Sequence, residues 1–227
     1  MIIYPIKTIC QFQIGVLTCY SIFDGYYEGG TTATLFANAP VTELKKACTE
    51  SGVPQQGIRL PCSCLLIDST DRKILLDTGY GHYSEENPMA PNAGKLLKNM
   101  AKIGIEPKEI DIVVLTHCDG DHIGGTVDKQ GDPRFPNAEY LISSREWSDR
   151  LNYLSSGKAS RPEQEFLSKY LVSLERQVGF INGEEIIAPG ILLSESVGHS
   201  AGHMIARIES EQDCLYYFSD TICHPLH

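Results

Sequence analysis

The hydrophobic residues of this chain fall in short runs that polar turns separate. Residues 8–22 form a β-branched run, and the turn pair Asp24-Gly25 closes it. Arg59–Asp68 and Lys73–Asp77 form two more runs on either side of a short polar connection. Runs of this length and composition predict strands, and short polar connections predict hairpins. Further strands are predicted at 110–115, 139–143, 185–196, 204–208 and 214–219.

Helical spacing of apolar residues is limited to a few stretches. Residues 92–103 repeat apolar side chains at helical intervals and end before Gly104, a typical helix stop. Thr42 is the candidate cap of a short helix that ends near Gly52, Ser144 is the candidate cap of another, and 162–174 is predicted to form a fourth. Residues 26–39 are predicted to form a covering loop. Strands before and after the helices indicate stacked α+β layers rather than a strictly alternating sheet.

The residues with the clearest chemistry directly follow the predicted strand 110–115. His117, Asp119, Asp121 and His122 place two imidazoles and two carboxylates within six residues. Imidazole suits zinc, iron and related ions, and carboxylate suits harder ions. A solvated polar loop is the alternative, but four ligand-type side chains in six positions favour a metal site.

Two further candidate ligands stand at the ends of other predicted strands. His199 lies in a loop of small residues, and Asp220 follows the strand 214–219. Each alone would be an ordinary loop or turn residue. Together with the first motif they indicate a site built from several strand ends, where rigid strands fix the ligands. Asp77, at the end of another strand, is predicted either to orient a ligand imidazole or to cap its own loop.

Composition narrows the class of protein. The 227 residues are 42% hydrophobic and 21% charged, so we expect one folded domain over residues 1–227. The net charge of −10 and the pI of about 5.1 argue against nucleic acid or an anionic membrane as a partner. The eight cysteines are predicted to be reduced thiols. The absence of a signal peptide and of a membrane-spanning run predicts a cytoplasmic protein.

Four motifs together resemble those of the metallo-β-lactamase superfamily: Leu75–Gly79, Thr116–Gly125, Gly198–His203 and Ser219-Asp220. Two more segments, 36–40 and 135–147, resemble the branch that contains N-acyl-homoserine lactonases and methyl parathion hydrolase-like enzymes. The resemblance implies a four-layer αββα sandwich with two divalent metal ions, zinc foremost, at one edge of the two sheets. It also implies a small-molecule substrate, and it is compatible with a homodimer.

The resemblance further implies a role for each candidate residue. The implied ligands are His117, Asp119 and His199 for the first metal, Asp121 and His122 for the second, and Asp220 as the bridge between them. His199, rather than His203, matches the ligand position of its loop. A hydroxide held between the metals would be the nucleophile, and Asp121 would pass a proton to the leaving group as the catalytic residue.

The chain departs from the family pattern at two places. Asp119 stands where the family usually has histidine, and a carboxylate there shifts the metal preference toward iron or manganese. The family also continues beyond the bridging aspartate to a final metal-binding histidine. His224 and His227 follow Asp220 too closely to replace it, so we expect the fold to lack its last elements. Cys223 occupies the position of a tyrosine that assists catalysis in lactonase-like relatives, which argues against that mechanism.

Three functions are compatible with these features. A metal-dependent hydrolase that acts on a small lactone- or ester-type substrate is the leading hypothesis. Asp119 motivates a second, a di-iron redox protein of the same fold that would need a separate electron donor. The altered ligand set motivates a third, a non-catalytic binding or sensing protein.

Overall fold

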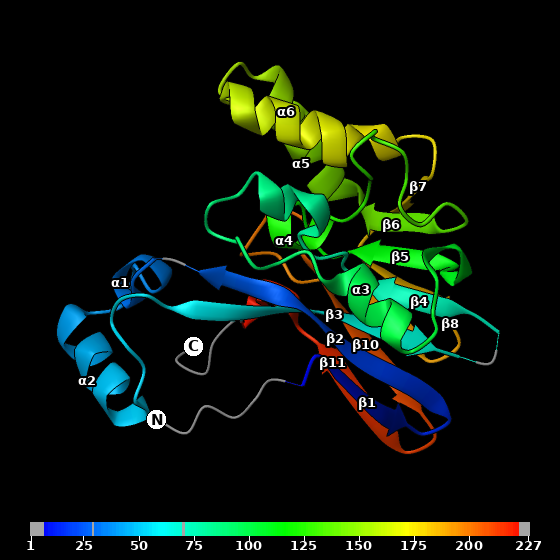
Figure 1. The fold of residues 1–227 in the computed structure, drawn as a ribbon, viewed down its shortest axis with the longest axis horizontal. Helices are drawn as coiled ribbons and strands as arrows, with labels where there is room; N and C mark the ends of the chain where they lie inside the picture. The colour runs from blue at the N-terminus through cyan, green and yellow to red at the C-terminus, as the bar shows by residue number, and fades with distance from the viewer. Residues whose placement is uncertain (1–6, 29, 70, 223–227) are drawn as a thin grey trace.

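Two β-sheets dominate the computed structural model, which describes residues 7–28, 30–69 and 71–222 (Figure 1). The larger sheet has seven strands in sequence order: β1 (Ile9–Ile14), β2 (Leu17–Glu28), β3 (Arg59–Asp68), β4 (Lys73–Leu76), β5 (Ile112–Leu115), β6 (Glu139–Ser143) and β7 (Val178–Ile181). The smaller sheet has four strands: β8 (Glu184–Ala188), β9 (Ile191–Glu195), β10 (Met204–Ser210) and β11 (Asp213–Tyr217). This mixed α+β architecture confirms the predicted fold class.

Strand direction in the larger sheet determines where polar loops gather. Strands β1 to β4 are antiparallel, whereas β4 to β7 pair in parallel. Parallel strands end at the same edge of a sheet. The residues that follow β4 and β5, including Asp77 and His117, therefore emerge side by side at one edge.

The helices over residues 96–102, 144–155 and 161–170 cover the outer face of the larger sheet, whereas those over residues 32–35 and 41–51 lie beside one end of β2 and β3 (Figure 1). The helices are α1 (Thr32–Leu35), α2 (Val41–Ser51), α3 (Leu96–Lys102), α4 (Gly120–Ile123), α5 (Ser144–Ser155) and α6 (Arg161–Tyr170), with short 3₁₀ turns η1 (Gly81–Glu85), η2 (Pro107–Glu109), η3 (Val172–Leu174) and η4 (Ser219–Thr221). Leu96, Met100, Trp147 and Leu167 of α3, α5 and α6 join one hydrophobic cluster with the strands beneath them. No helix among the described residues is long and apolar enough to cross a membrane.

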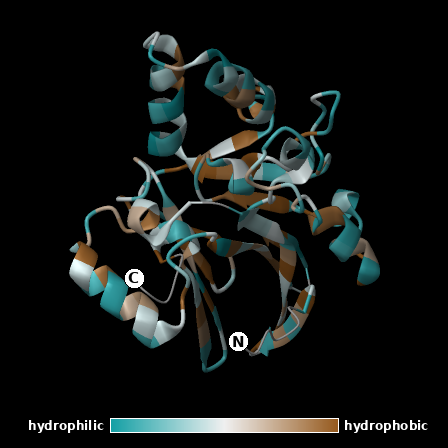
Figure 2. Cartoon of the chain, turned by 60° about the vertical axis from the view of Figure 1, so that its left-hand side comes forward, coloured by the Kyte–Doolittle hydropathy of each residue, from teal (hydrophilic) through white to brown (hydrophobic). Residues whose placement is uncertain are grey.

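A second hydrophobic cluster lies between the two sheets. It combines residues such as Leu65 and Val114 of the larger sheet with Leu193 and Ile208 of the smaller one, and its buried members in the described chain all come from strands. The two clusters thus form helix–sheet–sheet layers. Figure 2 shows the hydrophobic positions concentrated along the strands, while the outer helices carry hydrophilic faces.

Local structure differs from the sequence prediction at Asp24-Gly25. The pair does not end β2, which continues to Glu28 through a bulge between Phe23 and Gly25. Asp24 is fully buried there, and its carboxylate accepts hydrogen bonds from the backbone N–H groups of Tyr80 (2.9 Å), Gly94 (3.1 Å) and Leu96 (2.9 Å). The predicted turn is therefore a buried anchor that ties η1 and α3 to the sheet.

Two other boundaries shift by small amounts. The segment 26–39 is not only a loop, because it holds the end of β2 and the single-turn helix α1. Helix α5 begins at Ser144 as predicted, but Ser143 caps it, since the Ser143 hydroxyl accepts from the N–H groups of Arg145 and Glu146.

Candidate metal centre

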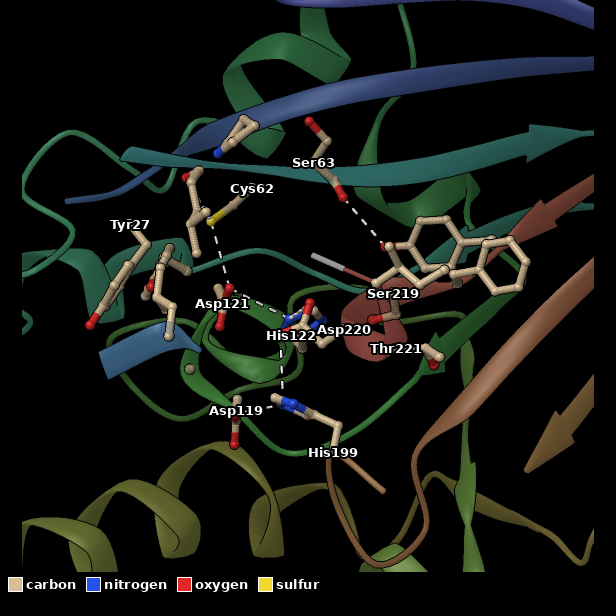
Figure 3. A pocket seen from close by; sticks show the side chains of 18 of the residues that line it. Tyr27, Cys62, Ser63, Asp119, Asp121, His122, His199, Ser219, Asp220 and Thr221 are labelled. Atoms are coloured by element: carbon tan, nitrogen blue, oxygen red, sulfur yellow. Dashed lines mark hydrogen bonds and ion pairs between the residues drawn. The ribbon is translucent and has the colours of Figure 1, made fainter. Parts of the chain in front are cut away.

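The predicted ligands meet at the edge where β4, β5 and β11 end (Figure 3). His117 directly follows β5, and the single-turn helix α4 carries Asp121 and His122. His199 comes from the loop between β9 and β10, and Asp220 lies in the turn after β11. Segments far apart in the sequence thus present their polar side chains to one site.

Among the described residues, His117 and His122 have buried imidazoles that lack a hydrogen-bond partner on one side of each ring. In the described part of the chain, the Nε2 atoms of both residues are buried and form no hydrogen bond. His117 Nε2 lies 3.6 Å from Asp119 Oδ2, and His122 Nε2 lies 3.6 Å from Asp220 Oδ1. An unpaired buried nitrogen is unfavourable unless something binds it. Both nitrogens therefore fit a metal ion as their missing partner.

Two groups of donor atoms could each hold a cation. His117, His122 and Asp220 form one group, and His117, Asp119 and His199 form the other, with the donor atoms of each group within 4.8 Å of one another. His199 Nε2 lies 3.3 Å from Asp119 Oδ2. Imidazole nitrogens mixed with carboxylate oxygens suit zinc, iron or manganese.

Asp121 lies beside these groups and belongs to neither. Its Oδ2 is 3.5 Å from His122 Nε2. The Cys62 thiol donates a hydrogen bond to the same oxygen, at 3.6 Å. Burial raises the pKa of Cys62 well above its ordinary value, so the group is a neutral thiol that can donate to the carboxylate. Cys62 carries no sequence signal, because it is one of several cysteines in apolar runs.

Asp77 orients His122 from behind. Its Oδ2 lies 2.9 Å from His122 Nδ1 and accepts from the Tyr217 hydroxyl at 3.0 Å, while its Oδ1 accepts from the Thr116 N–H at 2.9 Å. Burial would raise the pKa of Asp77, but the charge and hydrogen bond of His122 lower it below its ordinary value. Asp77 has a left-handed backbone, with φ of 64°. Of the two predicted roles for Asp77, the structure shows the contact that orients an imidazole.

His203 lies behind the site and not in either donor group. It is fully buried, and its Nε2 accepts a hydrogen bond from the backbone N–H of Asp220 at 3.2 Å. Burial and the neighbouring imidazoles of His117 and His199 lower the pKa of His203 to about 4. A neutral His203 can therefore accept this bond and support the Asp220 turn, and the choice of His199 as the ligand of this loop stays a prediction.

Two carboxylates that face the site remain ionised. Burial would raise the pKa of Asp119, but the nearby imidazoles of His117 and His199 lower it. Burial opposes ionisation of Asp220 in the same way, and His122 lowers its pKa. Ionised carboxylates gathered at one site attract cations.

Helix α5 contributes two residues that the sequence did not indicate. Glu146 is fully buried and accepts from the Ser200 hydroxyl at 2.6 Å and from the Gly202 N–H at 2.9 Å. Arg150 donates to Glu146 at 3.1 Å, and its Nη2 lies 3.7 Å from Asp119 Oδ1. A glutamate and an arginine four residues apart normally form a surface pair, so the sequence offered no signal for their position beside the ligands.

Five of the ligand-type residues line a cavity of about 950 Å³: Asp119, Asp121, His122, His199 and Asp220. Apolar and aromatic side chains form much of the remaining wall: Tyr27, Leu35, Leu60, Val197, Phe218 and Ile222. This volume falls in the range of small-molecule sites, which combine apolar walls with a few polar groups. Cys223, His224 and His227, considered in the sequence analysis, lie outside the described residues.

Curated proteins similar to this chain include a probable metallo-hydrolase and lactonases. Among curated proteins, a probable metallo-hydrolase of Mycobacterium tuberculosis is 26% identical over 74% of this chain and 59% of its own length. The N-acyl homoserine lactonase AiiA of Bacillus thuringiensis subsp. kurstaki is 22% identical over 70% of this chain and 62% of its own length. The chain therefore spans about three fifths of the length of these relatives.

Solved structures show the same fold. The dizinc quorum-quenching lactonase AidC, in complex with a product, superposes with a TM-score of 0.81 at 26% identity, covering 92% of this chain and 72% of AidC. A probable metal-dependent hydrolase from Staphylococcus aureus gives a TM-score of 0.78 at 23% identity, covering 95% and 77%. The family model for the Metallo-beta-lactamase superfamily matches residues 57–225. The chain belongs to the metallo-β-lactamase superfamily.

Proposed function

We propose that this protein is a metal-dependent hydrolase that cleaves the ester bond of a small lactone- or ester-type substrate. The observation that carries the proposal is the pair of buried Nε2 atoms of His117 and His122, which form no hydrogen bond within the described chain and face the carboxylates of Asp119 and Asp220 beside a cavity. The lactonases AidC and AiiA among the similar proteins support the substrate class.

The donor groups suggest how two ions would be held. The proposed ligands are His117, Asp119 and His199 for the first ion and Asp121 and His122 for the second, with Asp220 between them. Asp220 suits a bridging position, because its Oδ2 lies 3.7 Å from His199 Nε2 and its Oδ1 lies 3.6 Å from His122 Nε2. Asp77 and His203 would fix the orientation of His122 and of the Asp220 turn.

Bound divalent ions would supply a polarised substrate carbonyl and a water of lowered pKa. The chain's own residues would then place the substrate and move a proton. The apolar wall around Leu60 and Phe218 would hold the substrate body and exclude water. Asp121 faces the cavity and is held by Cys62, so its carboxylate is placed to take a proton from the attacking water and pass it to the leaving oxygen.

Hydrolysis by metal-loaded protein tests the proposal. Apo-protein would be loaded with zinc, manganese or iron and assayed with N-acyl homoserine lactones and aryl esters. We expect metal-dependent turnover that His199→Ala lowers by at least about a hundredfold, since a ligand is removed. A matched change far from the cavity, Lys46→Ala on the exposed face of α2, should leave turnover unchanged. No turnover with any of the three metals would refute the proposed activity.

The Asp119 carboxylate favours one second candidate, a di-iron redox protein. A hard oxygen ligand in the group with His117 and His199 suits iron better than an all-histidine site does. Protein purified from iron-supplemented cells would then contain iron and show its visible absorption, and a reductant would change that spectrum. Zinc alone in the purified protein, with no chromophore, would exclude this candidate.

A further inference from the structure

The carboxylate of Asp119, a proposed metal ligand, has a cationic neighbour on the side away from the histidines. Asp119 Oδ2 faces the site, 3.6 Å from His117 Nε2 and 3.3 Å from His199 Nε2. Its other oxygen, Oδ1, lies 3.7 Å from Nη2 of Arg150. This distance is too long for a hydrogen bond but short enough for an ion pair. The two oxygens thus have separate partners.

We propose that Arg150 is a positioning residue for the first metal site: it balances the charge of Asp119 and keeps Oδ2 directed at the metal. The proposal rests on the metal-dependent function proposed above. An aspartate in place of histidine adds one negative charge to a site that already holds the carboxylates of Asp121 and Asp220. A fixed guanidinium beside Oδ1 offsets that charge without occupying the ligand oxygen.

Arg150 is well placed to act as a fixed charge. Only a quarter of its side chain is exposed, at 25%, whereas most surface arginines are mobile and solvated. Its Nε donates to Glu146 one helical turn earlier, at 3.1 Å. Glu146 is fully buried and is held in turn by Ser200 and Gly202 of the loop that carries His199. Arg150 therefore belongs to a continuous network that joins both halves of the first metal site.

A purely structural role is the competing explanation. Arg150 could serve only to neutralise the buried Glu146, in which case its loss would disturb α5 whatever residue stands at position 119. The two explanations differ in one respect. A residue that balances Asp119 matters only while position 119 carries a carboxylate, whereas a partner of Glu146 matters regardless.

A metal-binding double-mutant cycle separates the two roles. Zinc and cobalt would be titrated into apo forms of the unmodified protein, Arg150→Met, Asp119→His and the double variant. We expect Arg150→Met to weaken one of the two metal sites by about tenfold or more and to change the visible spectrum of cobalt bound there. In the Asp119→His protein, Arg150→Met should have little effect. Arg145→Met, an exposed arginine on the same helix, is the matched control.

Each outcome of the cycle decides the matter. The role of Arg150 would be overturned if Arg150→Met lowered the metal affinity equally with and without the Asp119→His change, or did not lower it while Asp119 is present. Either result would leave the proposed function intact. An unmodified protein that binds no metal would overturn both. If Arg150→Met does not fold, Arg150→Lys keeps the charge on a shorter side chain, and it should retain affinity between those of the unmodified protein and Asp119→Ala. An affinity for Arg150→Lys as low as that of Asp119→Ala would contradict a charge-balancing role.

Discussion

Single residues determine how the imidazoles of this site are oriented. Asp77 is the clearest case, because it combines a left-handed backbone with a carboxylate that contacts His122, Tyr217 and Thr116. Aspartate and asparagine tolerate this backbone region better than most residues. Position 77 therefore constrains both the backbone and the side chain, and the two constraints can be separated by mutation.

Asp77→Ala and Asp77→Asn should differ in both stability and metal affinity. Alanine loses every side-chain contact and is strained at positive φ, so we expect the apo-protein to lose about 2–4 kcal/mol of stability and the metal affinity to fall about 10–100-fold. Asparagine fits the backbone and keeps one acceptor oxygen, so its losses should be smaller in both. Thermal unfolding of apo-protein and competition titration with a zinc chelator measure the two effects. Equal behaviour of the two variants would argue against an orienting role.

The candidate ligands could be predicted from the sequence, but the residues that position them could not. His117, Asp119, Asp121 and His122 stand out because chemically similar ligand types cluster within one short motif. Arg150 does not, because its partner Asp119 lies far away in the sequence and its spacing from Glu146 is that of any exposed helical pair. Candidate ligands can be recognised because they cluster in a short motif. The residues that position them cannot, because packing of distant elements brings them to the site.

At the scale of elements, buried polar contacts join strands and helices to the site. Asp24 at the β2 bulge holds the loop before η1 and the start of α3 through three backbone hydrogen bonds. An Asp-Gly pair normally marks a turn, so the sequence predicted the end of a strand there. At the bulge, Asp24 instead accepts from three N–H groups of residues 80, 94 and 96. These residues lie far away in the sequence, so the local sequence does not reveal the contact.

Asp24→Asn should destabilise the protein in a pH-dependent manner. Burial raises the pKa of Asp24 above its ordinary value, so the folded protein holds this proton at pH values where the unfolded chain has lost it. The contribution of Asp24 to the free energy of unfolding is therefore complete below about pH 3.9 and decreases as the pH rises toward the raised pKa.

The variant should lack this pH trend and lose about 2–3 kcal/mol near pH 4, because one backbone N–H then faces an amide donor. Urea unfolding at several pH values measures both effects. Asp149→Asn, at an exposed position of α5, is the control and should keep the trend of the unmodified protein. A trend that persists in Asp24→Asn would show that another group causes it.

The loop that carries His199 packs so closely on the start of α5 that position 202 has no room for a side chain. A Cβ atom at Gly202 would overlap the backbone nitrogen of Glu146 and the hydroxyl of Ser143. Gly202→Ala should therefore push this loop away from α5 and weaken metal binding by about tenfold or more, as measured by chelator competition. Ser200→Ala removes only one hydrogen bond to Glu146 and should have a smaller effect. Normal affinity in Gly202→Ala would show that the loop position does not control the site.

At the scale of the whole molecule, metal binding should stabilise the fold. The proposed ligands come from both sheets and from α4, so a bound ion would join these parts. Saturating zinc, at about a hundred times its dissociation constant, stabilises a protein by about 2.7 kcal/mol per site. For a chain of this length that corresponds to a rise in Tm of about 5–10 °C.

Chelation should reverse this increase, as differential scanning calorimetry can measure. Re-addition of zinc should restore the higher Tm in the unmodified protein and only part of it in His199→Ala. An identical Tm with and without metal would indicate that the donor groups do not bind an ion in the folded state.

Because the ribosome makes the chain from its N-terminus, Asp220 is the last of the proposed ligands to be synthesised. His117 and His122 leave the ribosome long before Asp220, which lies in the turn that follows β11. A nascent chain cannot complete the smaller sheet, or present Asp220 to the other proposed ligands, before β11 and its turn emerge. Metal capture by the full set of proposed ligands then waits until synthesis has passed this turn, and polypeptides that stop earlier would lack Asp220. Metal content would thus distinguish molecules that extend past Asp220 from prematurely ended ones.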